Sequence, residues 1–329
     1  MLSNIKFYLI FIFSFIGIFP LLADEIAPIE IILDGEASNK KLEMSGLAWY
    51  RDNLILMPQY VDLKSPAFYY VKKSELKNWV RKKEKNSIDP KRIELKMPNF
   101  DKMIDGYQGF EALCFHGDKI YLIIESKENN FMRSFLIMGT INFKKSMIDL
   151  SQSKLYEVPI PINLKNIGYE SILKHNSNLY LFFEANGADI TQNAYALRYS
   201  MSLDYKGKVP LQNIEYRLTD VSRADSRGSF WGINFFWPGE RSLLKPNKEN
   251  IMNKLNRGET HQRFDHVEQL LSFKIGKNGI SRTQLSPIQI ELNKESRNWE
   301  GLVMLDNLGF LMVVDEYPRT IFSFLPYKL

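Results

Sequence analysis

Trp299-Glu300-Gly301-Leu302-Val303 is the stretch that decides the fold, because versions of it occur five times in the chain. Each version has an aromatic residue, a Met or a Thr, followed by a polar residue and then a short strand-like run. The other four versions are Met44-Ser45-Gly46-Leu47, Phe110-Glu111-Ala112-Leu113, Tyr169-Glu170-Ser171-Ile172 and Thr219-Asp220-Val221-Ser222. Self-similarity of this kind is typical of an architecture built from repeated supersecondary units.

A second polar residue follows each version at a nearly constant distance. It lies fourteen residues after the first polar residue in four versions and fifteen residues after it in the last. These second positions are Gln59, Glu125, Glu184, Asn234 and Asp315. Between the repeats the chain shows short alternating apolar runs separated by turn residues, which indicates an all-β domain. We therefore predict a five-bladed β-propeller of four-stranded blades.

The last repeat leaves room for only three strands before the C-terminus. Ile29–Leu33 can supply the fourth strand, and we expect the last blade to be closed by this N-terminal strand, which would protect the strand edges. Lys73–Lys85 is predicted to form a short helical excursion in the first blade. Glu215–Leu218 is expected to be the outer strand of the third blade, and Tyr205-Lys206-Gly207-Lys208 only a hairpin turn.

The N-terminal segment is typical of a secretory signal. Lys6 precedes an apolar run from Phe7 to Leu22, and Ala23 offers a small residue for cleavage. The run is short for a bilayer span, which needs about 20 apolar residues, although an uncleaved anchor stays open. We expect residues 1–23 to be a signal peptide and residues 24–329 a single domain. The mature protein would be secreted or periplasmic and have no membrane span.

Composition narrows the range of partners. The formal net charge of +5 is small, and the basic residues are scattered along the chain. We therefore expect no nucleic acid partner, whereas this mild positive excess suits an anionic small-molecule ligand. Cys114 is the only cysteine, which excludes an intrachain disulfide. Because it lies in an apolar run, we expect a buried, unreactive thiol.

The repeated polar residues are predicted to meet at one mouth of the channel. In an antiparallel pair the beginning of one strand faces the end of the next, so the first and second polar positions of each repeat lie together. The predicted inner ring, which we take as the metal ligands, is Ser45, Glu111, Glu170, Asp220 and Glu300. The outer ring is formed by the second positions, Gln59, Glu125, Glu184, Asn234 and Asp315.

Such crowding of carboxylates requires compensation. Two unit charges 5 Å apart repel by about 3 kcal/mol at an effective dielectric constant of 20. Either some of the acids are protonated or a cation lies on the axis, and a set of hard oxygen ligands without His or Cys favours Ca²⁺. The alternative is that these side chains merely line a water-filled channel.

At these motifs the chain resembles the secreted bacterial propellers called phytase-like, or esterase-like activity of phytase, domains. The resemblance depends on Phe230–Gly239, Asn298–Leu302 and Val314–Thr320. More distantly, the order of Ser45, Glu111, Glu170 and Glu300 is similar to the alternating Ser and Glu ring of calcium-activated apyrase, with Asp220 where that family has Ser. The resemblance implies an axial Ca²⁺ and brings hydrolysis of phosphoesters or phosphoanhydrides into consideration.

If the chain is such a hydrolase, the outer-ring acids Glu125, Glu184 and Asp315 are the candidate catalytic bases, because the inner ring would be occupied by metal. The candidate substrate-binding residues are Arg319, Asn234, Gln59 and Arg263. A basic insertion, Pro238 to Asp265, is long enough to form a lid over the channel mouth. The alternative interpretation of the insertion is a solvated surface excursion.

Two other functions stay open on the sequence. A non-catalytic propeller could hold structural calcium and bind a ligand or a protein at its mouth. Lactone hydrolysis, as in gluconolactonase-like propellers, also uses an axial divalent metal held by Glu, Asp and Asn. The sequence contains neither a Gly-x-Ser-x-Gly elbow nor a Gly-x-x-x-x-Gly-Lys-Ser/Thr phosphate loop.

Overall fold

The computed structural model describes residues 24–82, 86–247, 257–316 and 319–328. The predicted signal segment, residues 1–23, and residues 248–256 of the predicted insertion lie outside this part of the chain. In the described residues, no helix is both long and apolar enough to cross a membrane.

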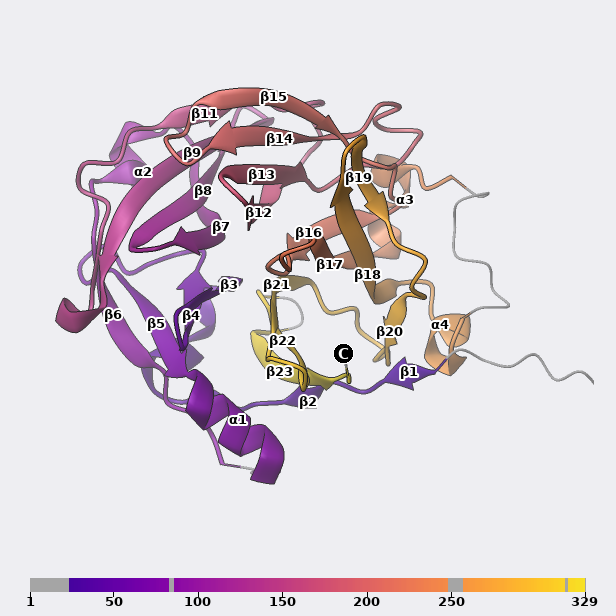
Figure 1. The fold of residues 1–329 in the computed structure, drawn as a ribbon, viewed down its shortest axis with the longest axis horizontal. Helices are drawn as coiled ribbons and strands as arrows, with labels where there is room; N and C mark the ends of the chain where they lie inside the picture. The colour runs from indigo at the N-terminus through magenta and orange to yellow at the C-terminus, as the bar shows by residue number, and fades with distance from the viewer. Residues whose placement is uncertain (1–23, 83–85, 248–256, 317–318, 329) are drawn as a thin grey trace, which may run out of the picture.

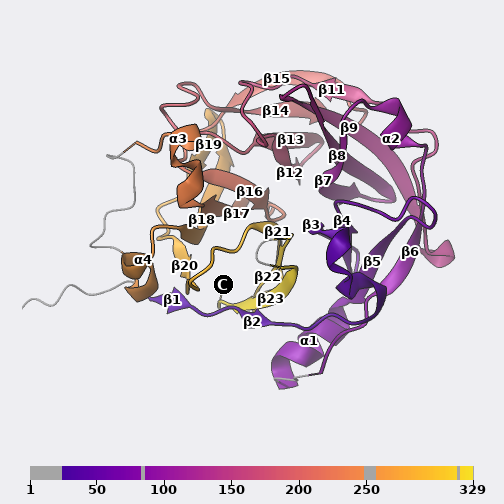
Figure 2. The ribbon, with the colours of Figure 1, turned by 180° about the vertical axis from the view of Figure 1, so that it is seen from behind.

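The structure is mostly β, and its sheets stand side by side around a central axis (Figures 1 and 2). Five strands lie closest to this axis: β3 (Met44–Tyr50), β7 (Tyr107–His116), β12 (Tyr169–His175), β16 (Arg217–Val221) and β21 (Trp299–Met304). They contact one another in the cyclic order β3, β7, β12, β16, β21 and back to β3. The innermost strands therefore enclose the axis completely.

Hydrogen bonding groups the described strands into four sheets. The largest sheet joins two antiparallel runs through a parallel pair, β6 with β10. The first run is β3, β4 (Asn53–Pro58), β5 (Ala67–Lys72) and β6 (Lys91–Lys96). The second is β7, β8 (Lys119–Glu128), β9 (Phe131–Asn142) and β10 (Met147–Asp149), with β11 (Tyr156–Val158) also on β9.

The remaining sheets each begin with one of the other innermost strands. One is formed by β12, β13 (Asn178–Phe183), β14 (Tyr195–Ser200) and β15 (Tyr205–Pro210). The next contains β16, β17 (Ser229–Phe236), β18 (Val267–Gly276), β19 (Gly279–Arg282), β20 (Ile288–Ile290) and β1 (Glu25–Ile26). The last contains β21, β22 (Gly309–Val314), β23 (Ile321–Pro326) and β2 (Ile29–Glu30).

The N-terminal segment fastens two sheets. As predicted, β2 adds to the last sheet, where it pairs antiparallel with β23 and Ile29 lies opposite Phe324. The structure adds a pairing that the sequence did not indicate, because β1 runs parallel to β20 in the neighbouring sheet. Both early strands follow the lower rim in Figure 1.

The predicted strand assignment was wrong in the third sheet. Tyr205–Pro210 forms the outer strand β15 and not merely a hairpin turn, while Glu215–Leu218 is not the outer strand of that sheet. Instead, Arg217–Val221 is the innermost strand of the next sheet. The error has a physical reason: no residue of β15 is buried, so its sequence lacks the alternating apolar pattern of a half-buried strand.

Helices are short and lie outside the ring. The predicted excursion in the first blade is confirmed as α1 (Lys73–Lys82), which buries Leu76 and Trp79. In the described residues, the other α-helices are α2 (Phe100–Met103), α3 (Arg241–Leu244) and α4 (Glu259–Arg263). The 3-10 turns are η1 (Gly35–Ser38), η2 (Lys40–Leu42), η3 (Phe143–Lys145) and η4 (Pro238–Glu240).

The hydrophobic core is divided among the interfaces between neighbouring sheets. Large aromatic side chains from one sheet meet those of the next, as Phe182 meets Phe230 with ring centroids 5.6 Å apart. Trp231 and Phe310 make the equivalent contact at 5.7 Å between the last two sheets. Packing between sheets therefore fixes the innermost strands relative to one another, and so positions the groups that face the axis.

We expect Ile31→Ala to lower the free energy of unfolding by about 2–4 kcal/mol. Ile31 is 1% exposed and packs in the apolar cluster between the last and the first sheet, and its N–H donates to the Phe322 carbonyl over 2.7 Å. The adjacent Ile32 is 56% exposed, so Ile32→Ala is the matched control and should change stability little. Urea unfolding followed by circular dichroism measures both, and equal effects would contradict closure by this strand.

Candidate metal centre

A β-bulge lies in each of the five innermost strands, at the polar residue of each repeat. In β12, Tyr169 pairs with Phe183 and Ser171 with Phe182, which leaves Glu170 without a partner across the ladder. The register shifts in the same way at Ser45, Glu111 and Glu300, and in β16 it shifts between Leu218 and Val221, a step that contains Asp220. A bulge bends the strand and changes the direction of its extra side chain. The repeated motif thus has a structural cause.

Three of these bulged residues form a compact carboxylate cluster. Glu111, Glu170 and Glu300 each offer an oxygen, and the three oxygens lie within 4.8 Å of one another. The three residues are only 4%, 6% and 6% exposed, respectively. Since Ca²⁺–oxygen distances are about 2.3–2.6 Å, oxygens on opposite sides of one ion are about 5 Å apart. The cluster therefore has the size of a single-cation site.

Neighbouring amides hold one oxygen of two of these glutamates. Gln59 Nε2 donates to Glu111 Oε1 over 2.7 Å. Asn298 Nδ2 donates to Glu300 Oε1 over 2.5 Å and to Asp315 Oδ2 over 3.2 Å. The other oxygen of Glu300, like Oε2 of Glu170, is buried and has no hydrogen-bond partner. Buried polar atoms are rarely left without partners, so these two oxygens are free to accept a ligand.

The pKa values of the three glutamates are shifted by their burial and by the carboxylates close to them. Burial, followed by the charges of neighbouring carboxylates, raises the pKa of Glu111, Glu170 and Glu300 well above the usual range of a glutamate. In the absence of a cation, burial therefore favours the protonated form of these groups. A bound cation would reverse this preference by favouring the charged form.

Two of the predicted catalytic acids have different surroundings. Glu184 accepts a hydrogen bond from the Gly168 N–H over 3.1 Å and forms an ion pair with the buried guanidinium of Arg217. Burial, then the charge of Glu184, raises the pKa of Glu125 to about 8. Glu125 Oε1 lies where a Cβ on Gly168 would meet it at 1.9 Å, so a larger residue at this position would force the carboxyl group of Glu125 to move.

Two predicted metal ligands bond to neighbouring strands instead. Ser45 Oγ donates to the Phe110 carbonyl over 2.8 Å. Asp220 Oδ2 accepts a hydrogen bond from the Leu302 N–H over 2.7 Å, and Asp220 does not belong to the three-residue group. Both bonds connect one innermost strand to another, so these side chains help to hold the ring that carries the glutamates.

The predicted substrate-binding residues are engaged in different ways. Gln59 contacts the cluster through Glu111. The amide of Asn234 donates to the carbonyls of Glu215 and Arg217 and accepts from Gln269. Arg319 makes a bidentate ion pair with Glu30, with both contacts at 2.7 Å. Arg263 lies 3.3 Å from Glu259.

The second described part of the predicted insertion, residues 257–265, is anchored at the periphery. His261 Nδ1 lies 2.7 Å from Glu25 Oε1, and the Thr260 N–H donates to Glu25 over 2.9 Å. The Gly258 N–H donates to Gln289 in β20 over 2.9 Å. Helix α4 accordingly lies beside β1 and β20 at the outer edge of the ring (Figure 1).

Sequence reasoning missed Arg217 and Asn298. Arg217 brings a buried positive charge to Glu184 and also lies 3.8 Å from Glu240, and Asn298 bridges Glu300 and Asp315. A signal was present in both cases, because Arg217 lies three residues before Asp220 and Asn298 lies two residues before Glu300. A polar residue just ahead of a bulge in a buried strand needs a partner nearby.

No family model and no curated protein matches the chain. Among solved structures, the catalytic domain of a Coprinopsis cinerea GH62 α-L-arabinofuranosidase has a TM-score of 0.49 at 7% identity, covering 92% of this chain and 97% of that one. A GH43_1 enzyme from Xanthomonas citri has a TM-score of 0.47 at 8% identity, covering 91% and 90%. A glucose dehydrogenase has a TM-score of 0.45 at 9% identity, covering 85% and 95%.

These comparisons correct the family prediction. A resemblance to phytase-like domains over the whole chain should produce a match to a family model, and none is found. The similar structures named above are two glycosidases of families 62 and 43 and a dehydrogenase, not phytases or apyrases. The predicted resemblance is therefore wrong, and so is the prediction of phosphoester hydrolysis that followed from it. At these identities and TM-scores the similarity assigns no substrate to this chain.

Proposed function

We propose that this chain binds a hard divalent cation, Ca²⁺ above all, between Glu111, Glu170 and Glu300. The observation that carries the proposal is the convergence of three buried carboxylates from three different innermost strands within 4.8 Å. The donors are oxygens only, and a set without His or Cys favours Ca²⁺ over zinc or copper.

The unpartnered oxygens support the fit of a cation. Oε2 of Glu170 and Oε2 of Glu300 are buried without a hydrogen bond, whereas the amides of Gln59 and Asn298 hold an oxygen of Glu111 and of Glu300 in place. These amides orient two of the carboxylates so that less freedom is lost when an ion binds. Ca²⁺ takes six to eight oxygen ligands, so water would complete its shell.

Charge balance points in the same direction. The pKa of Glu111, of Glu170 and of Glu300 responds to several nearby carboxylates, among them Glu184. Arg217 neutralises Glu184 directly. A divalent cation would compensate the remaining negative charge, which otherwise has to be removed by protonation.

We also propose that the ring is a five-bladed propeller with the cation on its axis. Five innermost strands in cyclic contact, each with a bulge at the same repeated motif, support this count. Export through a signal in residues 1–23 is part of the proposal, and the sequence pattern of that segment supports it.

A second candidate function is acid–base hydrolysis of a glycosidic bond. It is favoured by one pair of groups: Glu125, whose pKa is raised to about 8, and Glu184, which is ion-paired with Arg217. Such hydrolysis uses a pair of carboxyl groups whose surroundings differ, one of them with a raised pKa. Trp237, which is 52% exposed, follows β17 and precedes Glu240 of the Arg217 network, and its face could stack on a sugar ring.

We expect Glu170→Gln and Glu300→Gln to weaken calcium binding at least about tenfold, because each replaces a charged ligand oxygen by a neutral one. Isothermal titration calorimetry measures the affinity, and the melting temperature with Ca²⁺ should rise less in both variants than in the wild type. Glu75→Gln, on the exposed surface of α1, is the control and should bind as the wild type does. A wild type that melts identically with Ca²⁺ and with EDTA would refute the proposal.

In EDTA, we expect the stability of the wild type relative to Glu125→Gln to decrease as the pH rises from about 4.5 to about 8. The ordinary pKa of this carboxyl is 4.5, and burial raises it to about 8 in the folded protein. Between these values the unfolded chain loses a proton that the folded protein keeps, so the loss is at most about 1.4 kcal/mol per pH unit. The stabilisation of the folded protein by protonated Glu125 is complete below pH 4.5 and is lost above pH 8.

Urea unfolding of both proteins at pH 5 and pH 8 measures this difference. In the difference between the wild type and Glu125→Gln, the pH-dependent contributions of groups that titrate in both proteins, such as His261, cancel. Added Ca²⁺ should stabilise the wild type more at pH 8 than at pH 5, since the cation competes with protons for the carboxylates. A stability difference that is the same at both pH values would show that Glu125 ionises normally.

For the second candidate, we expect release of p-nitrophenol from aryl glycosides or of reducing sugar from arabinan. Glu125→Gln should reduce the rate at least about 100-fold, because loss of a general acid typically costs that much. Glu157→Gln, a surface acid paired with Arg133, is the control. Calcium binding without any such turnover would support the cation site and rule out the proposed hydrolysis.

A further inference from the structure

The innermost strands also line a cavity of about 310 Å³ at the end opposite to the carboxylate cluster. Its walls come from the second halves of β3, β7, β12 and β21, from the end of β16 and from Arg223 just after it. His116 at this end lies five residues after Glu111 on β7, a separation of about 16 Å along the strand. We propose that this cavity binds a small organic anion, namely a carboxylate with an apolar body.

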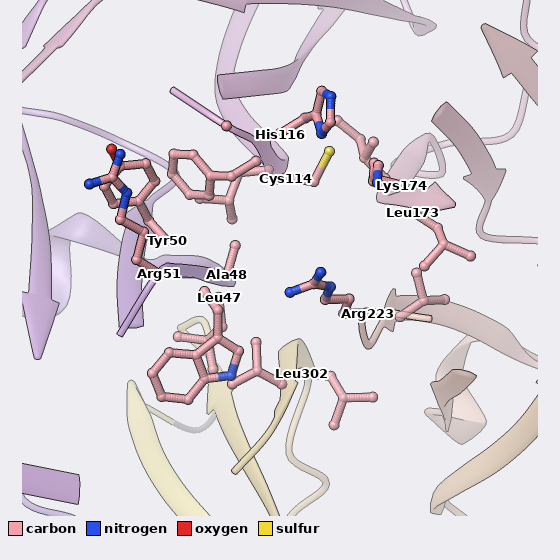
Figure 3. A pocket seen from close by; sticks show the side chains of 17 residues that line it. Leu47, Ala48, Tyr50, Arg51, Cys114, His116, Leu173, Lys174, Arg223 and Leu302 are labelled. Carbon is pink, nitrogen blue, oxygen red and sulfur yellow. The ribbon is translucent and has the colours of Figure 1, made fainter. Parts of the chain in front are cut away.

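Positive charges converge on this cavity. Arg223 and Lys174 both line it, and in Figure 3 the guanidinium of Arg223 projects toward the middle of the ring of side chains. In the described part of the chain, neither residue has an ion-pair partner. The lining also includes Arg51, which is paired with Asp118 over 2.9 Å, but no Asp or Glu among the described residues. Two cations facing a cavity without an acid favour an anionic head group.

The walls specify the rest of the ligand. The lining side chains are mainly aliphatic or aromatic, and they include Leu47, Leu113, Ile172, Leu302 and Val303. Small-molecule sites are typically cavities of about 300–1,000 Å³ with apolar walls and a few convergent polar groups. Arginine binds a carboxylate through two parallel hydrogen bonds, so an apolar carboxylate satisfies both the head and the walls of this cavity.

The acidic cluster does not oppose such a ligand. Lys174 lies four residues after Glu170 on β12, about 13 Å along the strand, and at physiological ionic strength charges separated by more than about 8 Å through solvent are largely screened. The same strands can therefore present carboxylates to a cation at one end and cations to an anion at the other. This site is independent of the proposed metal centre, since none of its lining residues belongs to the carboxylate cluster.

Titration calorimetry of the whole protein with hexanoate tests the proposal. We expect binding with a Kd of about 1 mM or tighter, much weaker binding of acetate, and much weaker binding of hexan-1-ol. Arg223→Gln should weaken hexanoate binding at least about tenfold, because a hydrogen bond to a charged group is lost. Arg227→Gln is the matched control, since Arg227 lies in the same loop, outside the cavity lining, and is paired with Asp225 at 3.7 Å.

Lys174 provides a second readout at the site itself. It lines the cavity, so Lys174→Gln should also weaken hexanoate binding, because it removes the second positive charge. Equal binding of hexanoate and hexan-1-ol would overturn the role of the cations, and equal binding of acetate would overturn the role of the walls. Hexanoate binding that responds neither to Arg223→Gln nor to Lys174→Gln would place the ligand elsewhere and overturn the proposal.

Discussion

Mutual repulsion between buried carboxylates is the constraint on which the rest of this structure depends. Glu111, Glu170 and Glu300 place oxygens within 4.8 Å of one another in surroundings almost free of solvent. At an effective dielectric constant of 20, one charged pair at this distance costs about 3 kcal/mol, a large part of the 5–15 kcal/mol that usually stabilises a domain. The ring must therefore be held together by contacts far from the axis, and the apolar interfaces between neighbouring sheets provide them.

The bulges explain why the polar residues recur at a fixed distance. The spacing of the two polar positions depends on the bulge and on the turn that joins the first two strands of a sheet. Between β3 and β4 this turn has two residues, Arg51 and Asp52, since Tyr50 pairs with Asn53. Between β21 and β22 it is longer, because the Leu305 N–H bonds to the Gly309 carbonyl. The longer turn accounts for the fifteen-residue spacing of Glu300 and Asp315 in place of fourteen.

Sequence reasoning was reliable where the geometry of the fold produces a regular pattern of residues in the sequence. The repeated motif led to the three clustered glutamates and to the pairing of the N-terminal strand with the last sheet. It failed for β15, because an edge strand with no buried residue leaves no apolar alternation. It also missed Arg217, since a single cation in a strand can be recognised as a partner of Glu184 only once the fold brings them together. The parallel pairing of β1 with β20 involves only two residues of each strand, which is too short to give a recognisable sequence pattern.

The false family resemblance follows from the same geometry. A polar residue after an aromatic one, ahead of a short strand, is what a bulge in an innermost strand requires in order to turn its side chain to the axis. The motif therefore reports how the side chain is directed and does not report what it binds or which reaction it serves. In this chain Glu170 and Asp220 occupy equivalent bulges, yet one has an unpartnered oxygen in the cluster and the other bonds to the Leu302 N–H. Function must accordingly be argued from the partners that each bulged residue finds.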